Sequence, residues 1–118
     1  MLRHIYFIPA PAQPQNLQYR CEDGKIRLTW KQSERKDETY YVVVKAFKFN
    51  EDKPCENYEE KAKDGIFYVL KPASSVKYIL SVYGKNKSAK LGRAAETEVI
   101  TGEKLTFYDF VSRICLLM

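Results

Sequence analysis

The chain is poor in the residue types on which most catalytic and metal sites depend. Its 118 residues include a single histidine, His4, which lies near the amino terminus and outside any predicted core. The fold therefore cannot assemble a histidine-activated nucleophile or a histidine metal site. The GxSxG, P-loop and dinucleotide-binding motifs are absent as well. The sequence predicts a protein that is not an enzyme and that uses no cofactor and no metal.

Cysteine is also scarce. Cys21, Cys55 and Cys115 are an odd number at wide spacings, which excludes a compact disulfide framework and offers no CxxC metal pair. At most one bridge can form. A bridge between Cys21 and Cys55 and a chain with three free thiols both fit the sequence, so the redox compartment stays open.

No apolar run approaches the roughly 18 residues of a membrane span. The amino terminus has a basic start at residues 1–4, a short apolar stretch at Ile5–Ile8 and an A-x-A-like end at Ala10–Ala12. These are the parts of a secretion signal, although four apolar residues are too few. A shortened signal and an ordinary extended leader over residues 1–13 both remain open, and Pro14 is the expected start of the domain.

The net charge of +5 fits either polyanion binding or the ordinary solubility of a small domain. Its distribution is uneven, because residues 71–93 carry six basic side chains and no acidic one, whereas residues 34–64 carry nine acids and seven bases. We expect a molecule with a basic end and a mildly acidic middle.

Alternating apolar residues predict β-strands along most of the chain. In residues 24–31, Ile26, Leu28 and Trp30 share one side, which is typical of a half-buried strand that ends in a core tryptophan. Residues 39–49 are the most β-prone stretch, and placing Val44 inward keeps Lys45 in solvent. The other predicted strands cover residues 16–21, 57–63, 66–70, a segment around 78–82, and 93–101. The sequence thus predicts an all-β, seven-stranded antiparallel sandwich without repeats.

Residues 103–118 differ in character from the rest, because apolar side chains crowd among few charges. Leu105, Tyr108, Val111 and Cys115 fall at helical spacing, whereas the many β-prone residues disfavour a helix. We expect a short apolar tail that is either helical or irregular.

Three motifs together carry a family likeness. Pro14 with Leu17 opens the first strand, Ile26-x-Leu28-x-Trp30 forms the second, and Leu70-x-Pro72 leads to Tyr78-x-Leu80-x-Val82. Over residues 14–102 the chain resembles a fibronectin type III domain, which implies an immunoglobulin-like Greek-key sandwich. The structural core expected from these patterns consists of Leu17, Ile26, Leu28, Trp30, Val44, Leu70, Pro72, Tyr78, Leu80 and Val82.

The resemblance also implies a role for Tyr78, whose hydroxyl would fold back onto nearby backbone in a tyrosine corner. The connection through residues 73–77 is about two residues longer than is usual in the family, so either the corner is distorted or Val76 fills part of the space. Neither an RGD tripeptide nor a WSxWS element is present. A narrower similarity, in the lysine-rich loop, the lone domain and the apolar tail, is to tapeworm oncosphere surface antigens.

The basic segment after the sixth strand is the first candidate site. Lys85, Lys87, Lys90 and Arg93 could bind a sulfated glycan or another polyanion, or they could be the charges of a solvated turn. Nucleic acid is a weaker candidate, because the loop has no aromatic residue for base stacking. Asn86 begins an N-x-S triplet on what we expect to be an exposed loop, and it is therefore a possible N-glycosylation site.

The second candidate site is an apolar face. In the chosen register, Tyr41, Val43 and Phe47 point outward beside Ile79 and Tyr83 of a neighbouring strand. Monomers seldom leave such a patch bare, so either the tail or another protein is expected to cover it.

These features predict a non-catalytic adhesion or recognition module, extracellular or at the cell surface, that binds a protein or an acidic glycan. The alternative is an intracellular scaffold domain with three reduced cysteines and no glycan binding. A carbohydrate module associated with an enzyme is a third, weaker reading, and it would need an exposed aromatic platform.

Overall fold

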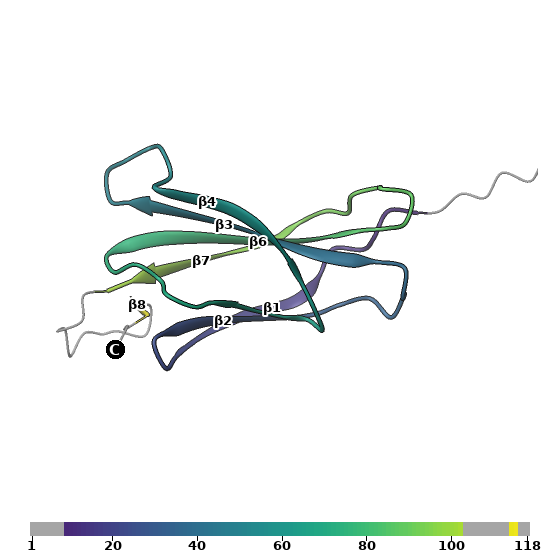
Figure 1. Ribbon diagram of the computed structural model, residues 1–118, viewed down its shortest axis with the longest axis horizontal. Coiled ribbons are helices and arrows are strands. Elements are labelled where there is room, and N and C mark those ends of the chain that lie inside the picture. The colour runs from purple at the N-terminus through teal and green to yellow at the C-terminus, as the bar shows by residue number, and fades with distance from the viewer. Residues whose placement is uncertain (1–8, 103–113, 116–118) are drawn as a thin grey trace, which may run out of the picture.

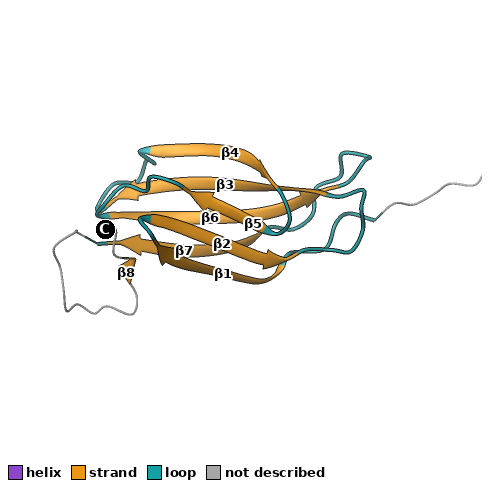
Figure 2. Ribbon diagram, turned by 60° about the horizontal axis from the view of Figure 1, so that its bottom comes forward, coloured by secondary structure: helices purple, strands orange, loops and turns teal. Residues whose placement is uncertain are grey.

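The computed structural model describes residues 9–102 and the backbone of residues 114–115. These residues form eight strands: β1 (Gln15–Glu22), β2 (Lys25–Lys31), β3 (Thr39–Lys48), β4 (Glu56–Ala62), β5 (Ile66–Val69), β6 (Val76–Lys85), β7 (Ala95–Thr101) and β8 (Ile114–Cys115). One sheet has the order β1-β2-β5 and the other β4-β3-β6-β7-β8, and the two pack face to face (Figures 1 and 2). This arrangement confirms the predicted seven-stranded antiparallel sandwich, to which β8 adds a short parallel strand.

The described residues contain no helix that is long and apolar enough to cross a lipid bilayer.

The pairing of β3 with β6 decides which side chains enter the core. Val42 pairs with Val82 and Val44 with Leu80, and all four side chains are buried. Lys45, the residue that fixed the predicted register, pairs with Ile79 on the opposite face and is exposed. The choice of register from the sequence is therefore confirmed.

Trp30 links the two sheets at the centre of the core. Its side chain is almost fully buried, and its ring lies 6.3 Å from the ring of Tyr40 on β3. Its backbone N–H donates to the carbonyl of Gly65, 3.1 Å away. Gly65 has a φ of +72°, and a Cβ there would lie 2.7 Å from the Trp30 carbonyl oxygen, so a glycine is required at this turn.

The tyrosine corner is formed despite the longer connection. The backbone N–H of Ala73 donates to the hydroxyl oxygen of Tyr78 at 2.8 Å, and this hydroxyl donates to Glu56 at 3.4 Å. Burial, assisted by the nearby Glu56 carboxylate, raises the pKa of Tyr78 to about 12. Val76 is buried, which agrees with the alternative in which it fills part of the space at the corner. Its N–H donates to the Thr101 hydroxyl.

The prediction that Leu70 belongs to the core is wrong. Its side chain is 62% exposed, because Phe67 and Val69 point inward along β5 and the next residue must point outward. Pro72 is only partly buried, and Leu17 is a partly buried residue packed against the core. The other seven expected core residues are buried.

Packed structure begins before the expected boundary at Pro14. Pro11 is buried against two glycines, since a Cβ at Gly84 would lie 2.8 Å from the Pro11 side chain and a Cβ at Gly92 would lie still closer to the Pro11 carbonyl oxygen. Gln13 donates a hydrogen bond to the carbonyl of Ala94. Residues 9–14 therefore include side chains that contact the sandwich, and the boundary at Pro14 stays a prediction; residues 1–8 lie outside the described part.

Most of the expected apolar tail also lies outside the described residues. The exception is β8, which is extended and pairs in parallel with the end of β7, Ile114 beside Ile100 and Cys115 beside Thr101. The helical alternative is therefore wrong for Ile114 and Cys115.

The state of the cysteines differs from both possibilities that the sequence left open. Cys21 is disulfide-bonded, whereas Cys55 is a free and exposed thiol. A bridge between Cys21 and Cys55 and a set of three free thiols are both excluded.

We predict that replacing Tyr78 with phenylalanine lowers the free energy of unfolding by about 1–2 kcal/mol, because the N–H of Ala73 loses its acceptor. Urea unfolding of Tyr78→Phe measures this, with Tyr68→Phe, an exposed tyrosine on β5, as the matched control. Equal stability of the two variants would contradict the role given to the corner.

Candidate binding surfaces

The outer face of the five-stranded sheet holds the five residues of the predicted apolar patch. Strand alternation puts Tyr41, Val43 and Phe47 of β3 on this face with Ile79 and Tyr83 of β6. All five are partly exposed. Their expected positions are thus correct, and their role in binding stays a proposal.

A stacked pair of tyrosines occupies one end of this face. The rings of Tyr41 and Tyr83 lie 5.6 Å apart at an interplanar angle of 21°. The Tyr83 hydroxyl donates to Glu59 on β4 at 2.9 Å, and partial burial together with this carboxylate raises the pKa of Tyr83 to about 12. The ammonium of Lys85 lies 5.8 Å from the centre of the Tyr41 ring. The pair is held in place by neighbours on two strands.

Polar residues divide the face, which is narrower than the continuous apolar surface expected from the sequence. Lys45 pairs with Ile79, and Ser81 lies between the tyrosines and Ile79 and donates to Glu96 at 3.0 Å. The apolar patch is therefore split into two parts. We call them the tyrosine end, with Tyr41 and Tyr83, and the phenylalanine end, with Phe47 and Ile79.

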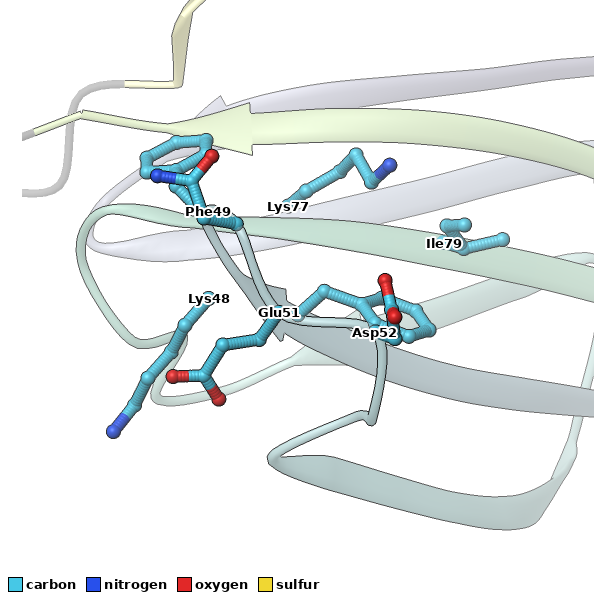
Figure 3. Close-up of a pocket in the computed structure, with 8 residues that line it drawn as sticks. Lys48, Phe49, Glu51, Asp52, Lys77 and Ile79 are labelled. Atoms are coloured by element: carbon cyan, nitrogen blue, oxygen red, sulfur yellow. The ribbon is translucent and has the colours of Figure 1, made fainter.

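A hollow of about 470 Å³ lies at the phenylalanine end (Figure 3). Phe47, Phe49 and Ile79 supply its apolar wall, and Lys48, Glu51, Asp52 and Lys77 surround it. Phe49 is 53% exposed, because β3 ends at Lys48 and a turn follows in which the N–H of Glu51 donates to the Lys48 carbonyl. The sequence reading missed Phe49, although a large apolar residue immediately before Asn50 at the start of a turn was a usable signal.

The basic loop between β6 and β7 is an ordered hairpin. Lys85 and Leu91 form a bridge, and the N–H of Gly92 donates to the carbonyl of Gly84 at 2.8 Å. Lys87, Lys90 and Arg93 are exposed. Within residues 9–102, no ion pair involves Lys85, Lys87 or Arg93. Lys85 reaches Tyr41, so the basic loop and the tyrosine end form adjoining surfaces.

Asn86 organises this loop, which is exposed at residues 87–91 as expected, although the Asn86 side chain itself is buried. The residue is 5% exposed. Its side-chain oxygen accepts hydrogen bonds from the N–H groups of Ser88 and Lys90, at 2.9 and 3.0 Å, and its amide nitrogen donates to the carbonyl of Pro9 at 3.0 Å. In the folded domain this nitrogen is therefore already bonded and is poorly placed to accept a glycan.

Solved structures with the same architecture place the domain in a fold family. The chain is similar to the FN5 domain of Drosophila Lar, with 18% identity, a TM-score of 0.60, and coverage of 79% of this chain and 98% of that one. It is also similar to the FN3 domain of human collagen XX, with 21% identity, a TM-score of 0.54, and coverage of 80% and 100%. The domain has the fibronectin type III fold.

A third similar structure, domains d3–d4 of the rat CD45 extracellular region, is 17% identical with a TM-score of 0.57, over 79% of this chain and 51% of that one. No protein-family model and no curated protein matches the sequence. These comparisons identify the fibronectin type III fold, and the narrower similarity to oncosphere antigens stays a prediction.

We predict that replacing Asn86 with alanine lowers the free energy of unfolding by about 1–3 kcal/mol, because three hydrogen bonds of the loop are lost. Hydrogen exchange at the amides of Ser88 and Lys90 should also become faster. Lys87→Ala, an exposed neighbour in the same loop, is the control. If both variants leave stability and exchange unchanged, Asn86 does not anchor the loop.

Proposed function

We propose that this domain is a non-catalytic interaction module, extracellular or at the cell surface, that binds a protein partner through the phenylalanine end of its five-stranded sheet. The observation that carries this proposal is the hollow beside the exposed ring of Phe49. Aromatic residues next to a preformed hollow are typical anchors of protein interfaces. The fibronectin type III fold supports the non-catalytic part, because such domains generally act by binding.

The walls of the hollow are chemically mixed, and part of them lies on paired strands. Phe47 and Ile79 lie on paired strands, so little backbone entropy is lost when a partner packs against them. The ammonium of Lys77 lies 5.9 Å from the Phe47 ring, while Glu51 and Asp52 border the hollow from the turn (Figure 3). An apolar centre with charges of both signs around it has the layout of an interface core and its polar rim.

The disulfide of Cys21 supports a location outside the cytosol, because disulfides persist mainly in oxidising compartments. The similar CD45 domains belong to an extracellular region. Both observations favour the extracellular proposal over the intracellular scaffold, for which three reduced cysteines are expected.

Binding of the fluorescent domain to cells, measured by flow cytometry, tests the proposal. We expect Phe47→Ala combined with Phe49→Ala to reduce binding at least about tenfold, because both aromatic anchors are removed. Tyr68→Ala with Leu70→Ala removes two exposed apolar side chains from the other sheet and should leave binding unchanged. Trypsin treatment of the cells should abolish binding if the partner is a protein.

Equal binding by the two double variants would contradict the proposed site. Binding that survives trypsin and disappears after enzymatic removal of heparan sulfate would replace the protein partner with a glycan.

The basic loop supports a second candidate function, which is the binding of a sulfated glycan. The observation that favours it is that the loop forms an ordered hairpin. Lys85, Lys87 and Arg93 form no ion pair within residues 9–102, and an ordered loop backbone loses less entropy on meeting an anion than a flexible solvated turn does. Replacing Lys85, Lys87, Lys90 and Arg93 with glutamine should lower the salt concentration that elutes the domain from a heparin column.

The control for this column experiment removes four exposed lysines that lie elsewhere, namely Lys25, Lys45, Lys48 and Lys53. It changes the net charge equally. If the loop is a specific site, the control should shift the eluting salt concentration less than the loop variant does. Equal shifts would mean that net charge alone causes the retention.

A further inference from the structure

The edge strands of the two sheets differ in how well they are protected against pairing with another strand. Within the described residues, β1 and β5 form the edges of one sheet, and β4 and β7 flank the other apart from the short β8. A free edge exposes unpaired N–H and C=O groups, and proteins usually blunt it with a bulge, a short strand, proline or lysine.

Three of these four strands carry such a device. The register of β1 shifts between Gln15 and Gln18, where Asn16 has a φ of 55°. β5 has only four residues. β4 exposes Glu59, Glu60 and Lys61, so charges of both signs follow one another along it.

β7 carries exposed charges of one sign, at Glu96 and Glu98, but none of the other devices. Its seven residues contain no proline, no lysine and no glycine, and its pairing with β6 runs from Ala95 to Ile100 without a register shift. On the side of β7 away from β6, the only pairing among the described residues is that of Ile100 and Thr101 with β8. This pairing shows that the edge accepts an extended segment. It leaves the backbone from Ala95 to Val99 without a ladder partner among the described residues on that side, where β1 of the other sheet lies nearby.

The charges of β7 select what can pair there. Glu96 and Glu98 are exposed on the outer face, and neither forms an ion pair within the described residues. The Ser81 hydroxyl holds the Glu96 carboxylate on this face at 3.0 Å. If two copies paired through β7, like charges would face each other at about 5 Å, which is unfavourable, whereas a basic strand would be attracted.

We propose that the edge of β7 from Ala95 to Val99 binds an extended segment of a partner protein in which lysine or arginine alternates with small or apolar residues. Backbone hydrogen bonds supply the attachment, as in other cases of strand addition. The basic side chains lie beside Glu96 and Glu98, and the alternate side chains lie on the side of Thr97 and Val99, which faces the core. Glu98 pairs with Ile79, which lines the hollow at Phe49, so the two surfaces adjoin. The inference rests on the backbone edge and the charges of β7, and it stands without the proposed function.

The test uses the full chain and a blocked synthetic peptide in which lysine alternates with threonine and valine. A second peptide has the same sequence but is N-methylated at alternate residues, so that it keeps its charge and cannot form the ladder. We expect the first peptide to bind and to slow hydrogen exchange in β7, and the second to bind at least about tenfold more weakly.

Two charge-reversal variants locate the site. Glu96→Lys with Glu98→Lys should weaken binding of the first peptide at least about tenfold, because attraction becomes repulsion at two positions. Glu34→Lys with Glu60→Lys, at two exposed residues away from β7, changes the net charge equally and should leave binding within about twofold. Three results would overturn the proposal: no binding, equal binding of both peptides, or equal losses in the two variants.

Discussion

The account of this domain depends on the pairing of β3 with β6, the most extensive ladder in the structure. Ten residues of each strand are in register, from Thr39 beside Lys85 to Lys48 beside Val76. Side chains alternate along a strand, so a slip by one residue would exchange the core face for the solvent face. The register that buries Val42 and Val44 also displays Tyr41 and Phe47. The same ladder therefore determines the core and the proposed binding surface.

Much of this arrangement could be predicted from the sequence, because its signals are local and periodic. A charged residue such as Lys45 can stay on a sheet only if it faces solvent, and this requirement orients every other side chain on β3. The spacing of Trp30, Pro72 and Tyr78 then indicated the sandwich and its tyrosine corner, which the Ala73–Tyr78 hydrogen bond confirms.

The rest could not be predicted, because it depends on contacts between segments far apart in the chain. Asn86 looks like an exposed loop residue until the carbonyl of Pro9, 77 positions away, is placed beside its amide. Phe49 becomes part of a hollow only when Lys77 and Ile79 form its other side. Leu70 was assigned to the core by its motif, whereas the alternation along β5 turns it outward.

Measuring solvent access by NMR, with a soluble paramagnetic agent, tests the central register most directly. The account predicts strong broadening of the side-chain signals of Tyr41, Val43 and Phe47. It also predicts little effect on Val42, Val44 and Leu80, together with nuclear Overhauser contacts between the rings of Tyr41 and Tyr83. The reverse pattern, with Val42 and Val44 broadened and Tyr41 and Val43 protected, would contradict the register and the binding surfaces inferred from it.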